Sequence, residues 1–494
     1  MSLCRSPSSP RPLRQRLMAL ALALTLPALT TCARAPATGD PIFTGGMTME
    51  KEREIGAEQH PKLVKAFGGE YEDPQMRGYV DELGETLAAQ SELPNLDWTF
   101  TLLDTPVVNA FALPGGYVYV TRGLVSLANN EAELAGVIGH EIGHVTARHS
   151  AERYGGSILA NVAGLASAIF LGGEAARATS SLGQVALASY SRSQEFQADS
   201  LGVRYLARTD YEAEAMATFL DSLQANTELQ ATLRGNPDAA DQFNIMQTHP
   251  RTPERVRAAI DDAAQTLDGT ITAREPFLDQ IAGLRYGYSP EEGFVRGRRF
   301  LHPTLRFAFE VPEGFTLFNA ATQVTAFGPE GAVIVFDRAQ KPGSADPLTY
   351  LQRDWAANAR LQEVERVSVN GLEAATGRTQ GRIRQGRRDF RLVAIRYDDD
   401  TIYRFMFVTK PGSTARFNVP FRETTHSFRA LDESEAQALK PLTLRIHTVQ
   451  QGESVDSLAR QMPFDDHQVL RFRTLNGLKE GDSLTPGQTV KLVE

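Results

Sequence analysis

Two histidines and a glutamate stand close together in the segment His140-Glu141-Ile-Gly-His144. Residues four apart on an α-helix lie on the same face, so both imidazoles can bind one metal ion. Glu141 lies about 100° around the helix and can reach a water molecule on that ion. A chance match is the alternative, but the chain has only nine histidines in 494 residues. The motif therefore predicts a Zn²⁺ site and hydrolysis, with His140 and His144 as ligands and Glu141 as the general base.

A catalytic zinc ion usually takes a third protein ligand in addition to water. One known pattern places a His six residues after the second ligand, but that position is Ser150 here, and the Gly that belongs between them is Ala147. His149 comes one residue too early and would point well off the metal face of a continuous helix. The third ligand is therefore expected from another segment.

Two acidic residues downstream, Glu195 and Asp199, are four residues apart and so share one face of a helix. Glu195 is the predicted third ligand, which makes the site a gluzincin type. Asp199 is predicted to accept the ring N–H of a ligand histidine. The alternative is a solvated acidic helix face.

The surrounding pattern places the motif inside a helix. Asn130 and Glu133 form a capping-box-like start, and apolar residues follow at helical spacing. Upstream, the periodicity predicts a helix, then a strand, then a hairpin turning at Pro114-Gly-Gly116. The helix face is Met76, Val80, Leu83 and Leu87, the strand is 98–103, and the hairpin strands are 110–113 and 117–120.

The motif at His140, the pair Glu195 and Asp199, and the segment Asn109–Gly116 together resemble the CAAX-protease and HtpX family of zinc peptidases, family M48. The resemblance is closest to the soluble periplasmic, BepA-like branch. It implies a mainly α gluzincin-type metallopeptidase domain with a small sheet, over residues 49–270, and one Zn²⁺ per chain.

The resemblance also implies a strand that pairs with an extended substrate through main-chain hydrogen bonds. The alternative is a hairpin that belongs only to the core. The residues of the predicted substrate strand are Asn109, Ala110, Phe111, Ala112 and Leu113.

The segment Thr248-His249-Pro250 through Arg255 matches a His-Pro loop of the same branch. The resemblance implies that His249 lies near the metal as an inhibitory latch or fourth ligand and that Arg255 faces the oxyanion. The alternative is a helix-entry turn with Arg255 on a solvated face.

Residues 1–31 have the layout of a secretory signal, with a basic region followed by the apolar run Leu17–Leu29. Cys32 then looks like the acylated residue of a bacterial lipoprotein, although Thr31 is unusual before it. Cleavage after Ala35 or Ala37 is the alternative. We expect a periplasmic protein anchored at the outer membrane, or else a secreted or soluble periplasmic one, with residues 32–48 as a tether.

Residues 276–435 alternate as strands between turn signals and predict a separate α+β antiparallel-sheet domain of unknown role. The segment weakly resembles PsbP and Mog-one modules. His302 and His426 are interpreted as structural.

Residues 444–494 resemble a LysM module, a small βααβ fold that binds glycans such as peptidoglycan. The likeness rests on His447–Ala459, Leu475–Leu478 and Leu484–Leu492. His447 stands where an aromatic residue is common, and an unrelated βααβ domain is the alternative.

The net charge of −9 argues against a broad nucleic-acid surface. The apolar segment 158–173 is interpreted as a buried or lid-like helix, and a membrane span is the alternative.

We predict a cell-envelope zinc endopeptidase that acts on misfolded or misassembled envelope proteins, with the outer-membrane assembly machinery as a further partner. One alternative is a non-catalytic assembly chaperone or peptidoglycan-binding adaptor with structural zinc, and another is peptidoglycan cleavage.

Overall fold

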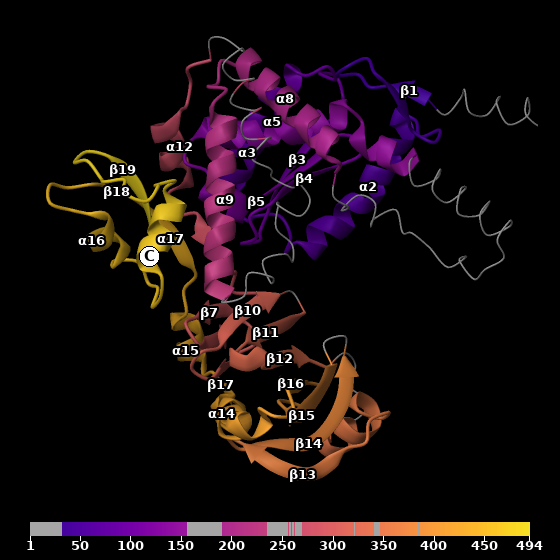
Figure 1. The fold of residues 1–494 in the computed structure, drawn as a ribbon, viewed down its shortest axis with the longest axis vertical. Coiled ribbons are helices and arrows are strands. Elements are labelled where there is room, and N and C mark those ends of the chain that lie inside the picture. The colour runs from indigo at the N-terminus through magenta and orange to yellow at the C-terminus, as the bar shows by residue number, and fades with distance from the viewer. Residues whose placement is uncertain are drawn as a thin grey trace, which may run out of the picture.

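In the structure, which is a computed structural model, the chain folds into three units (Figure 1). A mainly helical N-terminal unit is followed by a large antiparallel-sheet unit, and a small C-terminal unit lies beside the long helix α9 (Ala215–Arg234). The predicted order of a helical domain and an antiparallel-sheet domain is confirmed. The structure describes residues 32–155, 190–234, 255, 258, 261, 269–320, 322–339, 346–383 and 386–494.

The chain from Cys32 onward is folded against the helical unit, which differs from the tether expected for residues 32–48. Strands β1 (Cys32–Arg34) and β2 (Pro41–Phe43) form an antiparallel hairpin. Ala35 is buried, and the Ala37 N–H donates to the Thr146 carbonyl at 3.1 Å. The small side chains of Ala35 and Ala37 allow the backbone of this hairpin to lie close to Thr146.

The helical unit surrounds one core. Helix α3 (Pro74–Ala89) starts at the cap Asp73, with proline in its first turn, and buries the face predicted from Met76 to Leu87. The other helices are α2 (Met49–Ala66), α4 (Arg122–Leu127), α5 (Glu131–Thr146), α8 (Arg192–Arg208), α9 and α12 (Arg274–Ile281).

A small sheet lies under helix α5, in the strand order β3-β5-β4 among the described residues. The predicted strand and hairpin are confirmed, with β4 antiparallel and β3 parallel to β5. The turn needs glycine, because Gly115 has φ +88° and a Cβ there would come within 2.5 Å of the Arg53 Cα. The strands are β3 (Thr99–Leu103), β4 (Ala110–Leu113) and β5 (Tyr117–Thr121).

The sheet unit is built on seven described strands in the order β10-β11-β12-β16-β15-β14-β13. Aromatic residues fill the core between this sheet, helix α14 (Thr414–Ser427) and the smaller sheet β17-β9-β8-β7. The large-sheet strands are β10 (Thr316–Ala320), β11 (Gln323–Phe327), β12 (Val333–Arg338), β13 (Gln362–Val369), β14 (Leu372–Ile383), β15 (Gly386–Arg396) and β16 (Ile402–Thr409). The remaining elements are β7 (Phe294–Arg296), β8 (Arg299–His302), β9 (Phe307–Glu310), η2 (Pro329–Gly331), α13 (Pro347–Thr349), η3 (Tyr350–Trp355), β17 (Arg429–Ala430) and α15 (Glu433–Ala438).

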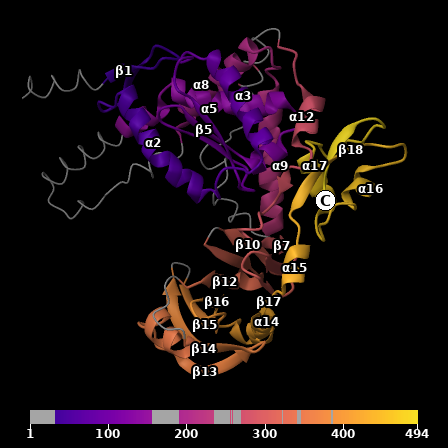
Figure 2. The same ribbon diagram turned by 180° about the vertical axis from the view of Figure 1, so that it is seen from behind.

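The C-terminal unit has the predicted strand–helix–helix–strand order, but it shares its core with the helical unit. Figures 1 and 2 both show α17 beside α9. Lys491 is fully buried, and its ammonium donates to the carbonyls of Ser126, Leu127 and Ala128 at 2.9, 3.0 and 2.6 Å. The elements are β18 (Leu442–Thr448), α16 (Val455–Ala459), α17 (Gln468–Leu475) and β19 (Thr489–Val493), with β6 (Arg285–Tyr286) pairing on β18.

No helix in the described parts of the chain is both long enough and apolar enough to cross a membrane. The apolar segment 158–173 lies outside the described residues.

Candidate metal centre

Helix α5 carries both histidines of the motif. It begins at Asn130, whose side chain accepts a hydrogen bond from the Glu133 N–H at 2.8 Å. His140 and His144 are one turn apart and are only 6% and 1% exposed. The helix therefore presents two buried imidazoles on one face, as the spacing predicted.

Glycines on helix α5 let helix α8 approach closely. A Cβ at Gly143 would lie 3.0 Å from the Leu201 Cβ and 3.2 Å from the Ala198 carbonyl oxygen. A Cβ at Gly139 would lie 3.3 Å from the Gly202 carbonyl oxygen. Sequence reasoning missed the role of these glycines, although their helical spacing beside the motif was a usable signal.

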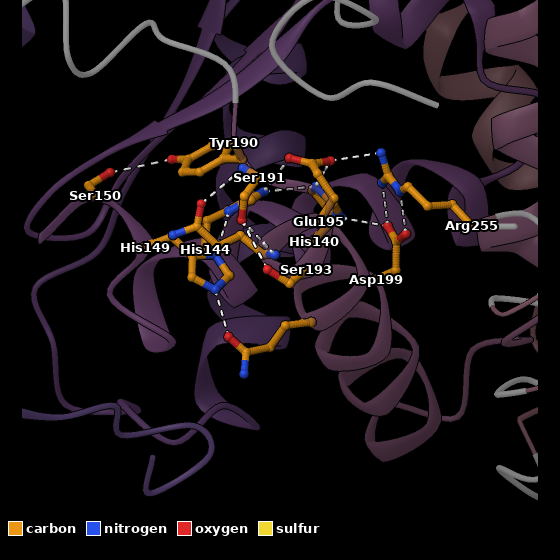
Figure 3. A network of polar contacts seen from close by, with 12 residues as sticks. His140, His144, His149, Ser150, Tyr190, Ser191, Ser193, Glu195, Asp199 and Arg255 are labelled. Carbon is orange, nitrogen blue, oxygen red and sulfur yellow. Dashed lines mark hydrogen bonds and ion pairs between the residues drawn. The ribbon is translucent and has the colours of Figure 1, made fainter. Parts of the chain in front are cut away.

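Helix α8 carries the acidic pair. It starts with a full capping box in which Ser191 and Gln194 bond each other's backbone N–H groups. Glu195 and Asp199, one turn apart, are both buried and point toward α5 (Figure 3). Glu195 and Asp199 thus lie on the same face of α8, as their spacing predicts.

Three donors converge between the two helices. The Nε2 atoms of His140 and His144 are 3.0 Å apart. Oxygens of Glu195 lie 3.8 Å from the His140 Nε2 and 3.6 Å from the His144 Nε2. The three residues offer one ligand atom each, all within 4.8 Å of one another.

The separations of the donors suit a tetrahedral zinc ion. Zinc bonds of about 2.0–2.2 Å place two tetrahedral ligand atoms roughly 3.3–3.6 Å apart. The two nitrogens are 3.0 Å apart, and each lies 3.6–3.8 Å from a different oxygen of Glu195, so the separations fall on both sides of this range. Two nitrogens and one carboxylate oxygen are also the donor types of catalytic zinc sites.

Asp199 holds the outer nitrogen of His140. Its Oδ1 accepts from the His140 Nδ1 at 2.9 Å, which directs the Nε2 of that ring toward the three-donor group. Burial alone would raise the pKa of Asp199, but hydrogen bonds from His140 and Arg255 outweigh burial and lower it. Asp199 is therefore a carboxylate near neutral pH.

Arg255 lies beside the acidic pair of helix α8. Its Nη1 is 2.7 Å from Glu195, and its Nε and Nη2 each lie 2.7 Å from an oxygen of Asp199. The side chain is only 2% exposed. Figure 3 shows Arg255 beside Glu195 and Asp199, and its role at an oxyanion stays a prediction.

His149 lies behind His144. Its Nδ1 is 2.8 Å from the His144 Nδ1, on the side of that ring away from the three-donor group. Burial lowers the pKa of His149 to about 4, so the ring is neutral near pH 7. Ser150 contacts Tyr190 through its hydroxyl at 3.3 Å.

Tyr190 covers His144, which sequence reasoning missed. The two rings stack with centroids 3.8 Å apart, and the Arg153 guanidinium lies 3.7 Å from the Tyr190 ring centroid. The position of Tyr190 just before the cap Ser191 was the one available signal.

Glu141 follows His140 on α5 and is fully buried. The edge strand β4 lies close by, because Ala112 and Leu113 line a small crevice together with His144 and Tyr190. Asn109, just before β4, bonds Thr121 through both its N–H and its carbonyl group. His249 and Pro250 lie outside the described residues.

A His-Glu-x-x-His helix next to a buried Glu from a second helix defines a metallopeptidase domain. A profile described as Peptidase family M48 matches residues 74–262. Residues 74–262 therefore match the family that the motif at His140–His144 resembles.

Known relatives agree with this assignment. A protein of Vibrio cholerae serotype O1 is 32% identical over 254 residues, which are 47% of this chain and 50% of the relative. A protein of Escherichia coli is 28% identical over 291 residues, 54% of this chain and 56% of the relative. Both carry the name beta-barrel assembly-enhancing protease. The chain spans about half the length of these relatives.

Shorter matches include a mitochondrial metalloendopeptidase, OMA1 of Arabidopsis thaliana, which is 34% identical over 136 residues, 28% of each chain. Among solved structures, a PsbP protein of Synechocystis covers 29% of this chain and 98% of its own, with 13% identity and a TM-score of 0.22. A score this low does not establish a shared fold, so the resemblance of residues 276–435 to PsbP stays a prediction.

Proposed function

We propose that this protein is a zinc-dependent endopeptidase that hydrolyses misfolded or misassembled proteins of the cell envelope. The observation that supports this most directly is the group His140, His144 and Glu195, with donor atoms within 4.8 Å of one another. The adjacent Glu141 supplies a carboxylate on the same helix. A purely structural metal site has no use for such a base.

In this proposal each residue has one task. His140, His144 and Glu195 would hold Zn²⁺, which would supply a Lewis acid for activating water and the scissile carbonyl. Glu141 would act as the general base for the attacking water and would later deliver the proton to the leaving amine. Asp199 keeps the His140 ring in the orientation that points Nε2 at the metal.

The substrate would lie along the edge strand β4. Residues Asn109–Leu113 offer main-chain hydrogen bonds to an extended peptide, with little selectivity for side chains. The crevice that joins Leu113 to His144 supports this placement, because it connects the strand to a proposed metal ligand. An extended peptide suits unfolded proteins better than folded ones.

We place the protein in the periplasm, with an anchor at the outer membrane through an acylated Cys32. Residues 444–494 are proposed as a LysM-like module for peptidoglycan, and the outer-membrane assembly machinery as a further partner. The names of the relatives from Vibrio cholerae and Escherichia coli support a role around β-barrel assembly. Those names favour a protease over the alternative of a non-catalytic chaperone or adaptor.

We also propose that His249 acts as an inhibitory latch. His249→Ala should then raise the rate of proteolysis over that of the wild type. An unchanged or lower rate in that variant would count against the latch.

Casein, an unfolded protein, tests the proposed activity. The metal-free protein should leave casein intact, and stoichiometric Zn²⁺ should restore cleavage. Cleavage by a chelated sample in which no zinc is detected would contradict the proposal. A zinc-loaded sample that leaves casein intact would instead favour the chaperone or adaptor.

A further inference from the structure

Three polar side chains form a hydrogen-bonded series that runs outward from the proposed metal site. The Nδ1 of His144 lies 2.8 Å from the Nδ1 of His149, and the Nε2 of His149 lies 2.7 Å from the Oε1 of Gln197. Figure 3 shows His144 and His149, which come from the helix α5 region, and Gln197 lies within α8. The series therefore links the two helices that supply the donors.

The direction of each hydrogen bond in this series follows from Gln197. Its Oε1 can only accept, so His149 carries its hydrogen on Nε2. The 2.8 Å contact between the two Nδ1 atoms needs one donor and one acceptor, and with its hydrogen on Nε2 the His149 ring offers Nδ1 as the acceptor. His144 must therefore donate from its own Nδ1, and its Nε2 carries a lone pair.

The Nε2 of His140 also carries a lone pair, for a different reason. Its Nδ1 donates to the Asp199 carboxylate at 2.9 Å, which leaves a lone pair on its Nε2 as well. The two Nε2 atoms face each other at 3.0 Å. Two lone pairs at this separation repel each other unless a cation lies between them, so the outer hydrogen bonds prepare both rings for a metal ion.

An unusual backbone turn brings His149 to this position. Helix α5 ends at Thr146, and Arg148 has φ +58°, in the left-handed region. A residue other than glycine pays roughly 1–2 kcal/mol for that conformation. Arg148 is held there by Glu52 at 3.1 Å and by the Met47 carbonyl at 2.8 Å. On a continuous helix His149 would point away from His144.

We propose that His149 and Gln197 are positioning residues that fix the tautomer of His144 and so raise the affinity of the site for zinc. The inference rests on the proposed metal site and deepens it. His149 accepts the Nδ1–H of His144, as Asp199 accepts the Nδ1–H of His140. The His149 ring does so without adding a third carboxylate beside Glu195 and Asp199.

The test is the zinc affinity of the full chain, measured by competition with a chromophoric chelator. His149→Phe keeps the ring volume but removes both nitrogens, and we expect about 10–100-fold weaker binding. Gln197→Met removes only the acceptor and should weaken binding in the same direction. Gln197→Glu keeps an acceptor and should stay within about threefold of the wild type, as the rescue that a packing role does not predict.

His60→Phe is the matched control, because His60 also bonds a neighbouring side chain, the Tyr119 hydroxyl at 2.8 Å, away from the three-donor group. Its zinc affinity should equal that of the wild type. If His149→Phe does not fold, the two Gln197 variants decide the question. Equal affinity in Gln197→Met, Gln197→Glu and the wild type would overturn the inference.

A second readout is the imidazole ¹⁵N spectrum of the zinc-loaded protein. We expect the hydrogen of His144 on Nδ1, and a hydrogen on Nε2 would overturn the inference.

The two proposals fail in different ways. A wild type that binds no zinc contradicts the proposed function, whereas a wild type that binds zinc no better than His149→Phe and Gln197→Met contradicts only the roles of His149 and Gln197.

Discussion

Arg255 holds Asp199 through two parallel hydrogen bonds, from Nε to Oδ2 and from Nη2 to Oδ1, both 2.7 Å long. Its third nitrogen reaches Glu195, also at 2.7 Å. Bidentate pairs of this kind fix geometry as well as charge. One buried guanidinium thus contacts two carboxylates, offsets part of their negative charge and sets where both of them point.

Arg255→Met should therefore destabilise the protein. Removing one partner of a buried ion pair costs about 3–5 kcal/mol, because the other charge stays buried. Urea unfolding of the metal-free protein measures this cost. Arg192→Met is the control, since Arg192 is exposed at the start of α8, and its unfolding free energy should stay within about 0.5 kcal/mol of the wild type. Equal stability of the two variants would refute the structural role of Arg255.

Gly143 should not tolerate a methyl group. In Gly143→Ala the new Cβ would press on Leu201 and Ala198, and overpacking of this kind costs about 1–3 kcal/mol. Because α8 carries Glu195, we also expect weaker zinc binding. Gly136→Ala is the matched control, since its nearest neighbour would be at an ordinary 3.5 Å. There we expect a gain of about 0.5–1 kcal/mol, because alanine favours helices.

Lys491 should stabilise the helix that precedes α5. Lys491→Met leaves three buried carbonyls without their donor, at a cost of about 1–3 kcal/mol. Thermal unfolding measures this loss. Lys479→Met is the control on the same unit, because the Lys479 side chain is 78% exposed and its pair with Asp221 is worth at most about 1 kcal/mol. Similar melting temperatures in both variants would show that the C-terminal unit contributes little to the fold.

His302 should make the stability depend on pH. Burial lowers its pKa to about 4, below the usual value of 6.5. A depressed histidine pKa stabilises the fold above pH 6.5, and this contribution is lost as the pH falls through 4. The loss is up to about 3 kcal/mol. The unfolding free energy of the wild type should therefore fall more steeply than that of His302→Gln between pH 7 and 4, and parallel curves would contradict this.

The sequence predicted the family resemblance and most of the donor arrangement because those features are local. The spacing of His140 and His144, and of Glu195 and Asp199, fixes which residues share a helix face. Strand alternation and the Pro114 turn likewise predicted the small sheet. These patterns need no knowledge of how distant segments pack.

Other features depend on contacts between distant segments and could not be read from local patterns. No spacing rule shows that Arg255 would contact the carboxylates of Glu195 and Asp199. The burial of Lys491 required the C-terminal unit to pack on α4. The hairpin after Cys32 depends on a close approach to the end of α5, at Thr146.

Wild type and Glu141→Gln compared side by side test the central claim most directly, through the zinc content of each purified protein and its cleavage of casein. The account predicts one zinc per chain in both proteins and loss of cleavage in Glu141→Gln, because the amide keeps the shape but cannot accept the proton. Equal cleavage by the two proteins would contradict it.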